Sequence, residues 1–231
     1  MAALTPEIVA AVIDQVRPKY TLTPPQALEI TIRRVIDAIE KNIPGDLVEC
    51  GTWMGGCSYA MLHVQRAIYG EIRRPVWMYD SFEGMSPPSK EDGNHAAGWY
   101  GEQTNLPRDV ASNHYCIAPY PLVVAAVAEQ GFQDHVILRK GWLADTLPER
   151  KPDQVAVLRI DCDWYEPVMC CLEQLVPNVS VDGSIILDDY YAWEGCTLAT
   201  HEYLAKHNHP WIIRSIEDGH GCWMIKRPAT W

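Results

Sequence analysis

The sequence has no apolar run that approaches the roughly 20 residues needed to cross a bilayer. Its N-terminus also lacks a basic region followed by an apolar one, so we expect no secretory signal peptide. Basic residues are scarce: 19 lysines and arginines stand against 30 acidic residues, which gives a net charge of −11. That balance argues against a nucleic-acid partner and against binding to an anionic membrane. With 48% hydrophobic residues, the chain can still form a large core.

Cysteine pairs at metal-binding spacing are missing as well. None of the eight cysteines forms a C-x-x-C pair, which argues against a zinc site or a disulfide framework. Free thiols inside apolar stretches are typical of a reducing cytoplasm, which is the localisation that we expect. Cys162 lies beside acidic residues, which raise the pKa of a thiol and disfavour a nucleophilic role.

The G-x-G-x-x-G turn of dinucleotide-dependent dehydrogenases is also absent, which disfavours that class. A different glycine-rich turn occupies residues 51–56, between a predicted strand at 46–50 and a predicted helix at 57–70. In such an arrangement a nucleotide can approach both the backbone and the N–H groups of the helix N-terminus. By itself, the turn is equally compatible with a plain tight connection.

Asp80 strengthens the nucleotide interpretation. It ends the next predicted strand, residues 75–80, and lies 29 positions beyond Gly51. An acidic residue at that strand end is placed to hydrogen-bond both hydroxyls of a ribose. The two features together predict a nucleoside-containing ligand.

Four aspartates follow two short apolar runs that predict buried parallel strands. Asp161 and Asp163 follow residues 155–160, whereas Asp188 and Asp189 follow residues 184–187. The segment between the runs suits one crossover helix, so all four carboxylates should meet at the same edge of the sheet. Clustered carboxylates repel one another, and Mg²⁺ is the simplest compensation. The alternative is that each aspartate only caps the following helix.

The rest of the chain predicts one α/β domain over residues 1–231. We expect a mostly parallel sheet with a terminal antiparallel hairpin, helices on both faces and a helical extension over residues 1–42. Residues 86–121 show no clear period, which favours a lid or substrate wall that closes together with the region around Tyr20. The remaining predicted elements are helices at 122–131 and 196–206, a strand at 135–139, and hairpin strands at 211–215 and 222–225.

Five segments resemble a known family, the macrocin-type (TylF-like) O-methyltransferases, which methylate hydroxyls on antibiotic sugars and related natural products. They occur in the order of the family and cover residues 45–56, 79–85, 141–148, 158–166 and 183–190. The resemblance implies a class I methyltransferase (Rossmann-like) fold, S-adenosylmethionine as the methyl donor and a required Mg²⁺. The chain departs from the family pattern at Met54, where arginine is usual, and over residues 86–121.

The resemblance also implies roles for individual residues. On the cofactor side, the methionine part would meet Glu49 and the turn residues Gly51 and Thr52, the ribose would meet Asp80 and Ser81, and the adenine side would meet Gly141 and Trp142. Asp161 would lie against the cofactor and also bind the metal, together with Asp188 and Asp189. Asp163 matches the proposed general base, for which His114 is a second candidate.

The expected reaction is Mg²⁺-dependent transfer of a methyl group to a small-molecule hydroxyl acceptor, either a sugar or a vicinal diol of the catechol kind. Two adjacent acceptor oxygens could bind the ion, which would lower the pKa of one hydroxyl. One competing interpretation is a glycosyltransferase that holds a metal with Asp161-Cys162-Asp163. Another is a nucleoside-binding module without turnover. The sequence leaves open whether the chain forms a homodimer.

Overall fold

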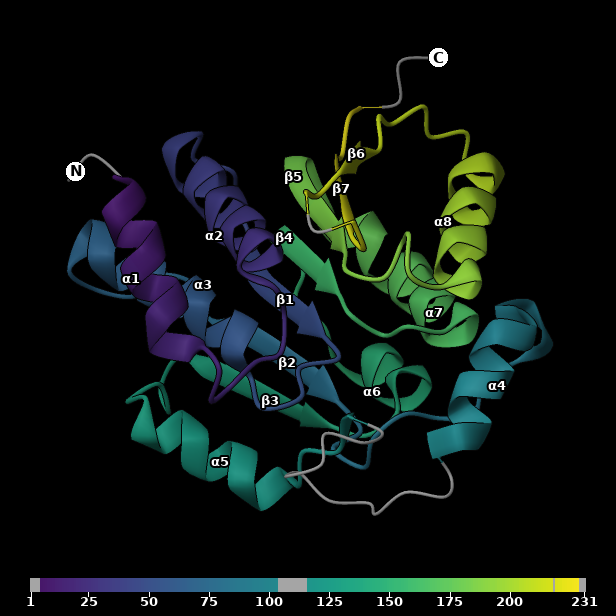
Figure 1. Ribbon diagram of the computed structural model, residues 1–231. Helices are drawn as coiled ribbons and strands as arrows, with labels where there is room; N and C mark the ends of the chain where they lie inside the picture. The colour runs from purple at the N-terminus through teal and green to yellow at the C-terminus, as the bar shows by residue number, and fades with distance from the viewer. Residues whose placement is uncertain (1–4, 104–115, 218, 229–231) are drawn as a thin grey trace.

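A computed structural model describes residues 5–103, 116–217 and 219–228. Within these residues, seven strands form a single sheet in the order β3-β2-β1-β4-β5-β7-β6 (Figure 1). The first five strands run parallel, and β7 pairs antiparallel with both β5 and β6. The strands are β1 (Asp46–Cys50), β2 (Val76–Asp80), β3 (Val136–Lys140), β4 (Val155–Ile160), β5 (Val179–Leu187), β6 (Arg214–Ser215) and β7 (Cys222–Ile225).

These strands confirm the predicted sheet with its terminal hairpin. Strand β5 starts at Val179, five residues earlier than the run at 184–187 predicted. The pairing of β4 with β5 shifts register between Val155 and Val157, so the early part of β5 bulges away from the regular ladder. Only residues 214–215 of the predicted strand at 211–215 are paired.

Helices cover both faces of the sheet (Figure 1). One buried apolar cluster joins the sheet to α1, α2, α3 and α5, and a second joins it to α6, α7 and α8. The helices are α1 (Pro6–Val16), α2 (Pro25–Glu40), α3 (Gly56–Tyr69), α4 (Gly93–Gln103), α5 (Tyr120–Glu129), α6 (Leu143–Glu149), α7 (Tyr165–Leu175) and α8 (Glu194–Lys206), with 3-10 turns at Lys90–Asp92 and Val176–Asn178.

The two N-terminal helices share the main core. Their apolar faces are buried in the same cluster as α3, which the hydrophobic spacing in α2 predicts. The connection between them, residues 17–24, is called here the strap. Its Tyr20 is buried, packs edge-to-face on Tyr59 of α3 at 5.4 Å between ring centroids, and accepts the backbone N–H of Gly56 at 2.9 Å. The strap is thereby fixed beside the glycine-rich turn.

The sequence predicted no regular structure between residues 86 and 121, and this prediction is wrong in part. A 3-10 turn and helix α4 occupy residues 90–103. Helix α4 contains three glycines, and Ala96 is the one residue in it with a fully buried side chain. It therefore lacks the apolar stripe that reveals a helix in a sequence. Helix α6 was not expected either; it has seven residues and contains Pro148.

None of the helices described is long and apolar enough to span a membrane.

Candidate active site

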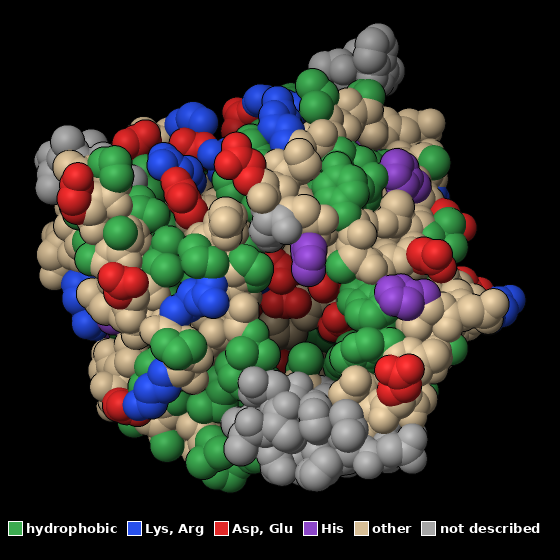
Figure 2. Space-filling model, in the orientation of Figure 1, with side chains coloured by type: hydrophobic (Ala, Val, Ile, Leu, Met, Phe, Trp, Pro, Cys, Tyr) green, Lys and Arg blue, Asp and Glu red, His purple; other side chains and the backbone are tan. Residues whose placement is uncertain are grey.

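The carboxyl ends of β1, β2, β4 and β5 open into a cavity of about 300 Å³, which the strap closes on one side. Figure 2 shows acidic side chains at the bottom of a hollow on this face of the molecule. Most of the residues predicted to form a site line the cavity: Glu49, Gly51, Thr52, Asp80, Ser81, Gly141, Trp142, Asp161, Asp163 and Asp188. The topology brings them together because parallel strands end at a common edge.

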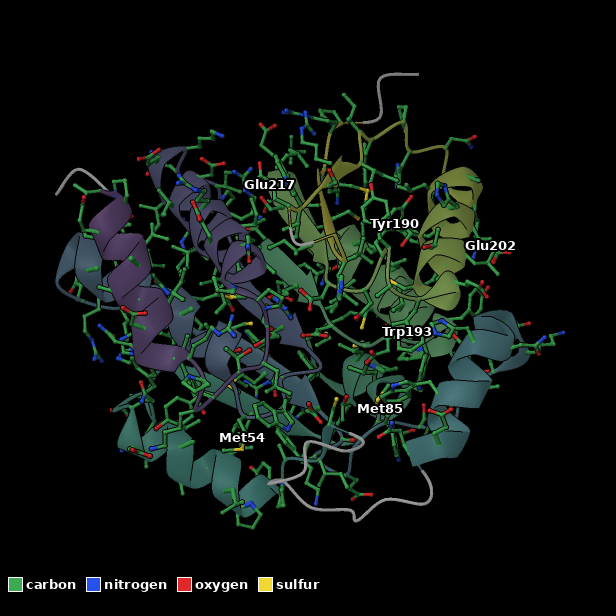
Figure 3. The ribbon with its side chains drawn as sticks, viewed as in Figure 1. Met54, Met85, Tyr190, Trp193, Glu202 and Glu217 are labelled. Carbon is green, nitrogen blue, oxygen red and sulfur yellow. The ribbon has the colours of Figure 1, made fainter. Side chains whose placement is uncertain are left out.

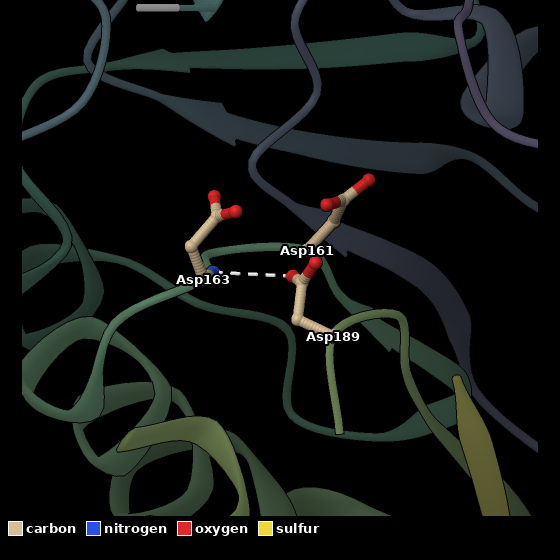
Figure 4. Close-up of side chains that lie close together, drawn as sticks. All are labelled: Asp161, Asp163 and Asp189. Carbon is tan, nitrogen blue, oxygen red and sulfur yellow. Dashed lines mark hydrogen bonds between the residues drawn. The ribbon is translucent and has the colours of Figure 1, made fainter. Parts of the chain in front are cut away.

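Three aspartates form the acidic cluster: Asp161, Asp163 and Asp189. Each offers one carboxylate oxygen, and these oxygens lie within 4.8 Å of one another (Figure 4). The backbone N–H of Asp163 donates to Asp189 Oδ2 at 3.2 Å. Burial, followed by the neighbouring aspartates, raises the pKa of both Asp163 and Asp189. The cluster is therefore costly to ionise without a compensating cation.

Asp188, which precedes Asp189 in the chain, pairs with a cation. Its Oδ1 is 2.6 Å from Nη2 of Arg159. The predicted metal ligands were Asp161, Asp188 and Asp189, whereas the three oxygens that lie closest together belong to Asp161, Asp163 and Asp189. Arg159 pairs with Asp188 through Nη2 and with Asp161 through Nη1, and Asp161 also belongs to the acidic cluster.

Arg159 is the largest feature of the site that the sequence analysis missed. It is 0% exposed, lies in β4 and pairs in register with Glu49 of β1. Its Nη1 lies 2.6 Å from Asp161 Oδ2 and 3.3 Å from Glu49 Oε1. Burial lowers the pKa of Arg159, but the surrounding carboxylates more than offset this and hold the guanidinium charged. A single arginine within an apolar strand was the available signal, since such a residue must find buried partners.

Glu49 links the sheet to the glycine-rich turn. It is 1% exposed, and its Oε2 accepts both the backbone N–H and the hydroxyl of Ser58 in the first turn of α3, at 3.0 and 2.5 Å. Burial raises the pKa of Glu49 to about 7, although Arg159 and Ser58 act in the opposite direction. The position of Gly51 requires glycine: its φ is +77°, and a Cβ there would lie 1.7 Å from the carbonyl oxygen of Asp161.

Asp80 has fewer acceptor positions available than the ribose interpretation requires. Its Oδ2 accepts the backbone N–H groups of Thr52 and Trp53 at 2.8 and 2.9 Å, and its Oδ1 accepts that of Phe82 at 2.7 Å. Burial raises the pKa of Asp80 against the effect of these donors. A carboxylate has about four acceptor positions in all, so about one remains, on Oδ1. That leaves room for one ribose hydroxyl rather than two.

The other cofactor-side residues lie around the rim. Ser81 uses its hydroxyl within its own turn: it donates to Gly84 O at 2.9 Å and accepts the N–H of Glu83 at 3.1 Å. Trp142 follows Gly141, precedes α6 and is 46% exposed, so its ring is not part of the core. An exposed indole on a cavity wall is suited to stacking against a flat base.

Asp163 is held in an uncommon conformation. Its φ is +58°, in the left-handed region that non-glycine residues seldom adopt. The indole N–H of Trp193 donates to its Oδ1 at 3.0 Å. The ring of Trp193, labelled in Figure 3, also contacts the rings of Trp164 and Trp99 edge-to-face, at 5.0 and 5.6 Å between centroids. The sequence analysis did not anticipate this aromatic support.

Three further residues from the sequence analysis are Cys162, His114 and Met54. A hydrogen bond with Cys171, together with burial and the neighbouring aspartates, raises the pKa of Cys162 well above its ordinary value, so a thiolate nucleophile is disfavoured. His114, the second candidate base, lies outside the described residues. Met54, where the family has arginine, packs against the apolar cluster on the α3 side of the sheet (Figure 3).

The residues of the cavity fit both groups that the sequence implies. Carboxylate oxygens suit Mg²⁺, and an ion among Asp161, Asp163 and Asp189 would compensate charges that the fold otherwise has to bury. On the cofactor side, Asp80 keeps one acceptor position and Trp142 offers an open ring face.

Comparisons with known proteins show which family the chain belongs to. The sequence model of the macrocin O-methyltransferase (TylF) family matches residues 10–226. A rhamnosyl-tetracenomycin C 4'-O-methyltransferase of Streptomyces olivaceus is 39% identical over 167 residues, which cover 72% of this chain and 60% of that protein. The demethyldecarbamoylnovobiocin O-methyltransferase of Streptomyces niveus is 36% identical over 198 residues, covering 81% and 68%.

A solved structure, that of the O-methyltransferase NovP, superposes with a TM-score of 0.77 at 33% identity and covers 90% of this chain and 82% of its own. The predicted class I, Rossmann-like methyltransferase fold is thereby confirmed. The chain belongs to the macrocin O-methyltransferase (TylF) family.

Proposed function

We propose that the protein transfers a methyl group from S-adenosylmethionine to a sugar hydroxyl of a natural product, with the help of Mg²⁺. The observation that carries this proposal is the single cavity that joins the ends of β1 and β2 to Asp161 and Asp163. One half of this cavity has the features of a nucleoside site and the other has those of a cation site. A methyl donor and an acceptor could therefore lie side by side in it.

On the cofactor side, the chain's own residues would orient the donor. Asp80 would accept one ribose hydroxyl, Trp142 would stack on the adenine, and Glu49 with the glycine-rich turn would line the methionine part. The strap residues Thr21 and Thr23 also line the cavity and would help to exclude water. When bound, S-adenosylmethionine would supply the electrophilic methyl group, and Mg²⁺ would lower the pKa of an acceptor hydroxyl.

Asp163 is the proposed base. It lines the cavity, and the hydrogen bond from Trp193 fixes one of its carboxylate oxygens. Burial and Asp161 raise its pKa, which brings it nearer to that of an activated hydroxyl and makes it a better proton acceptor. Asp163 would accept the proton that the acceptor hydroxyl loses on methylation.

The relatives support a sugar acceptor. One is named for the 4'-oxygen of a dimethoxyrhamnosyl tetracenomycin and another for the 3''-oxygen of mycinamicin III. Ser86 and Cys116 line the cavity, and Trp99 contacts Trp193, which bonds to Asp163. The described residues of 86–121 would therefore help to select the acceptor. The competing glycosyltransferase interpretation gains nothing from the family comparison, which finds methyltransferases.

The test is a transfer assay with S-adenosylmethionine labelled in its methyl group, Mg²⁺ and a panel of glycosylated natural products with free vicinal sugar hydroxyls. We expect label in at least one product, at a sugar oxygen located by mass spectrometry and NMR. A protein that binds no S-adenosylhomocysteine and labels none of the panel would contradict the proposal.

A further inference from the structure

Arg159 contacts side chains from four separate parts of the site. Its Nη1 donates to Asp161 and Glu49 at 2.6 and 3.3 Å, and its Nη2 donates to Thr23 Oγ1 at 3.2 Å and lies 2.6 Å from Asp188 Oδ1. Among the described residues, its Nε has no hydrogen-bond partner. One buried guanidinium therefore joins the ends of β1, β4 and β5 to the strap.

The four partners divide between the two halves of the cavity. Asp161 and Asp188 are on the side of the acidic cluster, whereas Glu49 and Thr23 line the cofactor side. We propose that Arg159 is a positioning residue that orders both halves of the site at once, so that the binding of the metal and of the cofactor depends on the same guanidinium. This inference rests on the proposed function.

The geometry requires arginine rather than any cation. A guanidinium is planar and presents its donors in a fixed fork, so it can serve several carboxylates in set directions, whereas a lysine ammonium is a single point of charge. With 0% exposure, Arg159 has no water available to replace a lost partner. Replacing it by lysine therefore removes the positioning while retaining the charge.

The retained charge makes Arg159→Lys the informative variant. A guanidinium that acted only as a counter-charge would be replaced adequately by lysine. If it acts by position, the Mn²⁺ affinity of Arg159→Lys should fall by about 10–100-fold, the usual effect of losing a group that orients metal ligands. The affinity for S-adenosylhomocysteine should fall by about fivefold or more, which is comparable to one lost hydrogen bond. Both are measured by calorimetry with MnCl₂ alone and with S-adenosylhomocysteine alone.

Two control variants separate this role from simple destabilisation. Leu172→Ala removes a buried side chain of α7 in the cluster on the other face of the sheet, so it should lower the Tm but leave both affinities unchanged. Asp80→Asn alters the cofactor side alone and should weaken S-adenosylhomocysteine binding while sparing Mn²⁺. Loss of both affinities in Arg159→Lys, together with retention of Mn²⁺ binding in both controls, is the predicted pattern.

A milder pair of variants applies if Arg159→Lys does not fold. Thr23→Val removes the strap's acceptor for Arg159. The Thr23 hydroxyl also accepts the thiol of Cys57, so Cys57→Ala is the control that removes this second contact and leaves Arg159 paired with Thr23. We expect Thr23→Val to weaken S-adenosylhomocysteine binding about threefold or more relative to Cys57→Ala. Equal affinities in these two variants would contradict the proposal.

Titrations of the wild-type protein distinguish a failure of the proposed function from a failure of the role inferred for Arg159. A wild-type protein that binds neither Mn²⁺ nor S-adenosylhomocysteine would overturn the proposed function and this inference with it. Normal wild-type binding, with both affinities unchanged in folded Arg159→Lys, would overturn the inference alone.

Discussion

The indole N–H of Trp193 donates to Oδ1 of Asp163 at 3.0 Å, which links the residue before α8 to the proposed base after β4. The backbone of Asp163 is in the left-handed region, and its N–H is bound by Asp189. One oxygen of the carboxylate and the backbone of Asp163 are thus held before any acceptor arrives. Such preorganisation is what a proton acceptor requires.

Replacing Trp193 by phenylalanine should keep the aromatic packing and remove this hydrogen bond. The bond lowers the pKa of Asp163, so its loss should raise that pKa and move the acidic limb of the pH–rate profile to higher pH. Trp164→Phe is the matched control, since its indole N–H donates to the Ser86 carbonyl instead. An acidic limb that shifts equally in both variants would argue against a specific role for Trp193.

Asp163→Asn tests the role of base against that of metal ligand. We expect the rate constant for methyl transfer to fall by about 10²–10⁴, the usual range for a lost general base. Mn²⁺ affinity, measured by calorimetry, should remain within about threefold of wild type if two other carboxylates suffice to hold the ion. A large loss of Mn²⁺ affinity would instead assign Asp163 to the metal, as its place in the acidic cluster also permits.

Asp80 should recognise one ribose hydroxyl, because three backbone N–H groups already occupy most of its acceptor positions. Between 2'-deoxy and 3'-deoxy S-adenosylhomocysteine, one analogue should bind more weakly than the parent by about 1–3 kcal/mol, the cost of an unpaired polar group. The other should bind nearly as well. Equal and large losses for both analogues would show that the carboxylate accepts both hydroxyls.

Glu49 predicts a pH dependence of stability in the metal-free protein. Its folded-state pKa is about 7, against an ordinary value of 4.5. The folded state therefore holds the proton more tightly, so this contribution to the free energy of unfolding is complete below pH 4.5 and is lost as the pH rises to about 7. Glu49→Gln can still accept from Ser58 and should lose roughly 2–4 kcal/mol of this pH dependence. Urea unfolding in EDTA measures it; identical pH dependence in the two proteins would contradict the account.

Much of the sheet could be predicted because its strands are short apolar runs that end in turn residues or acidic residues. The convergence of Asp161, Asp163, Asp188 and Asp189 follows from parallel topology alone. Side-chain orientation could not be read in the same way. The pairing of both Asp161 and Asp188 with Arg159 could not be predicted, because a single arginine in an apolar strand does not show which residues will be its partners.

The aromatic support of the site was also out of reach of sequence patterns. Trp99, Trp164 and Trp193 come from three different elements, and helix α4, which carries Trp99, has no apolar stripe. Contacts that form only when distant elements pack leave no local spacing to detect. The prediction that residues 86–121 close over the site together with the strap stays a prediction. Hydrogen exchange with and without S-adenosylhomocysteine would check it.

The dependence of methyl transfer on a divalent cation tests the central claim most directly. Wild-type protein is assayed with labelled S-adenosylmethionine and the acceptor that the panel identifies, first with excess EDTA and then after Mg²⁺ is restored. Because the carboxylate of Asp189 lies close to those of Asp161 and Asp163, which line the cavity, we expect transfer to stop in EDTA and to return with Mg²⁺. Full activity in EDTA would contradict the account.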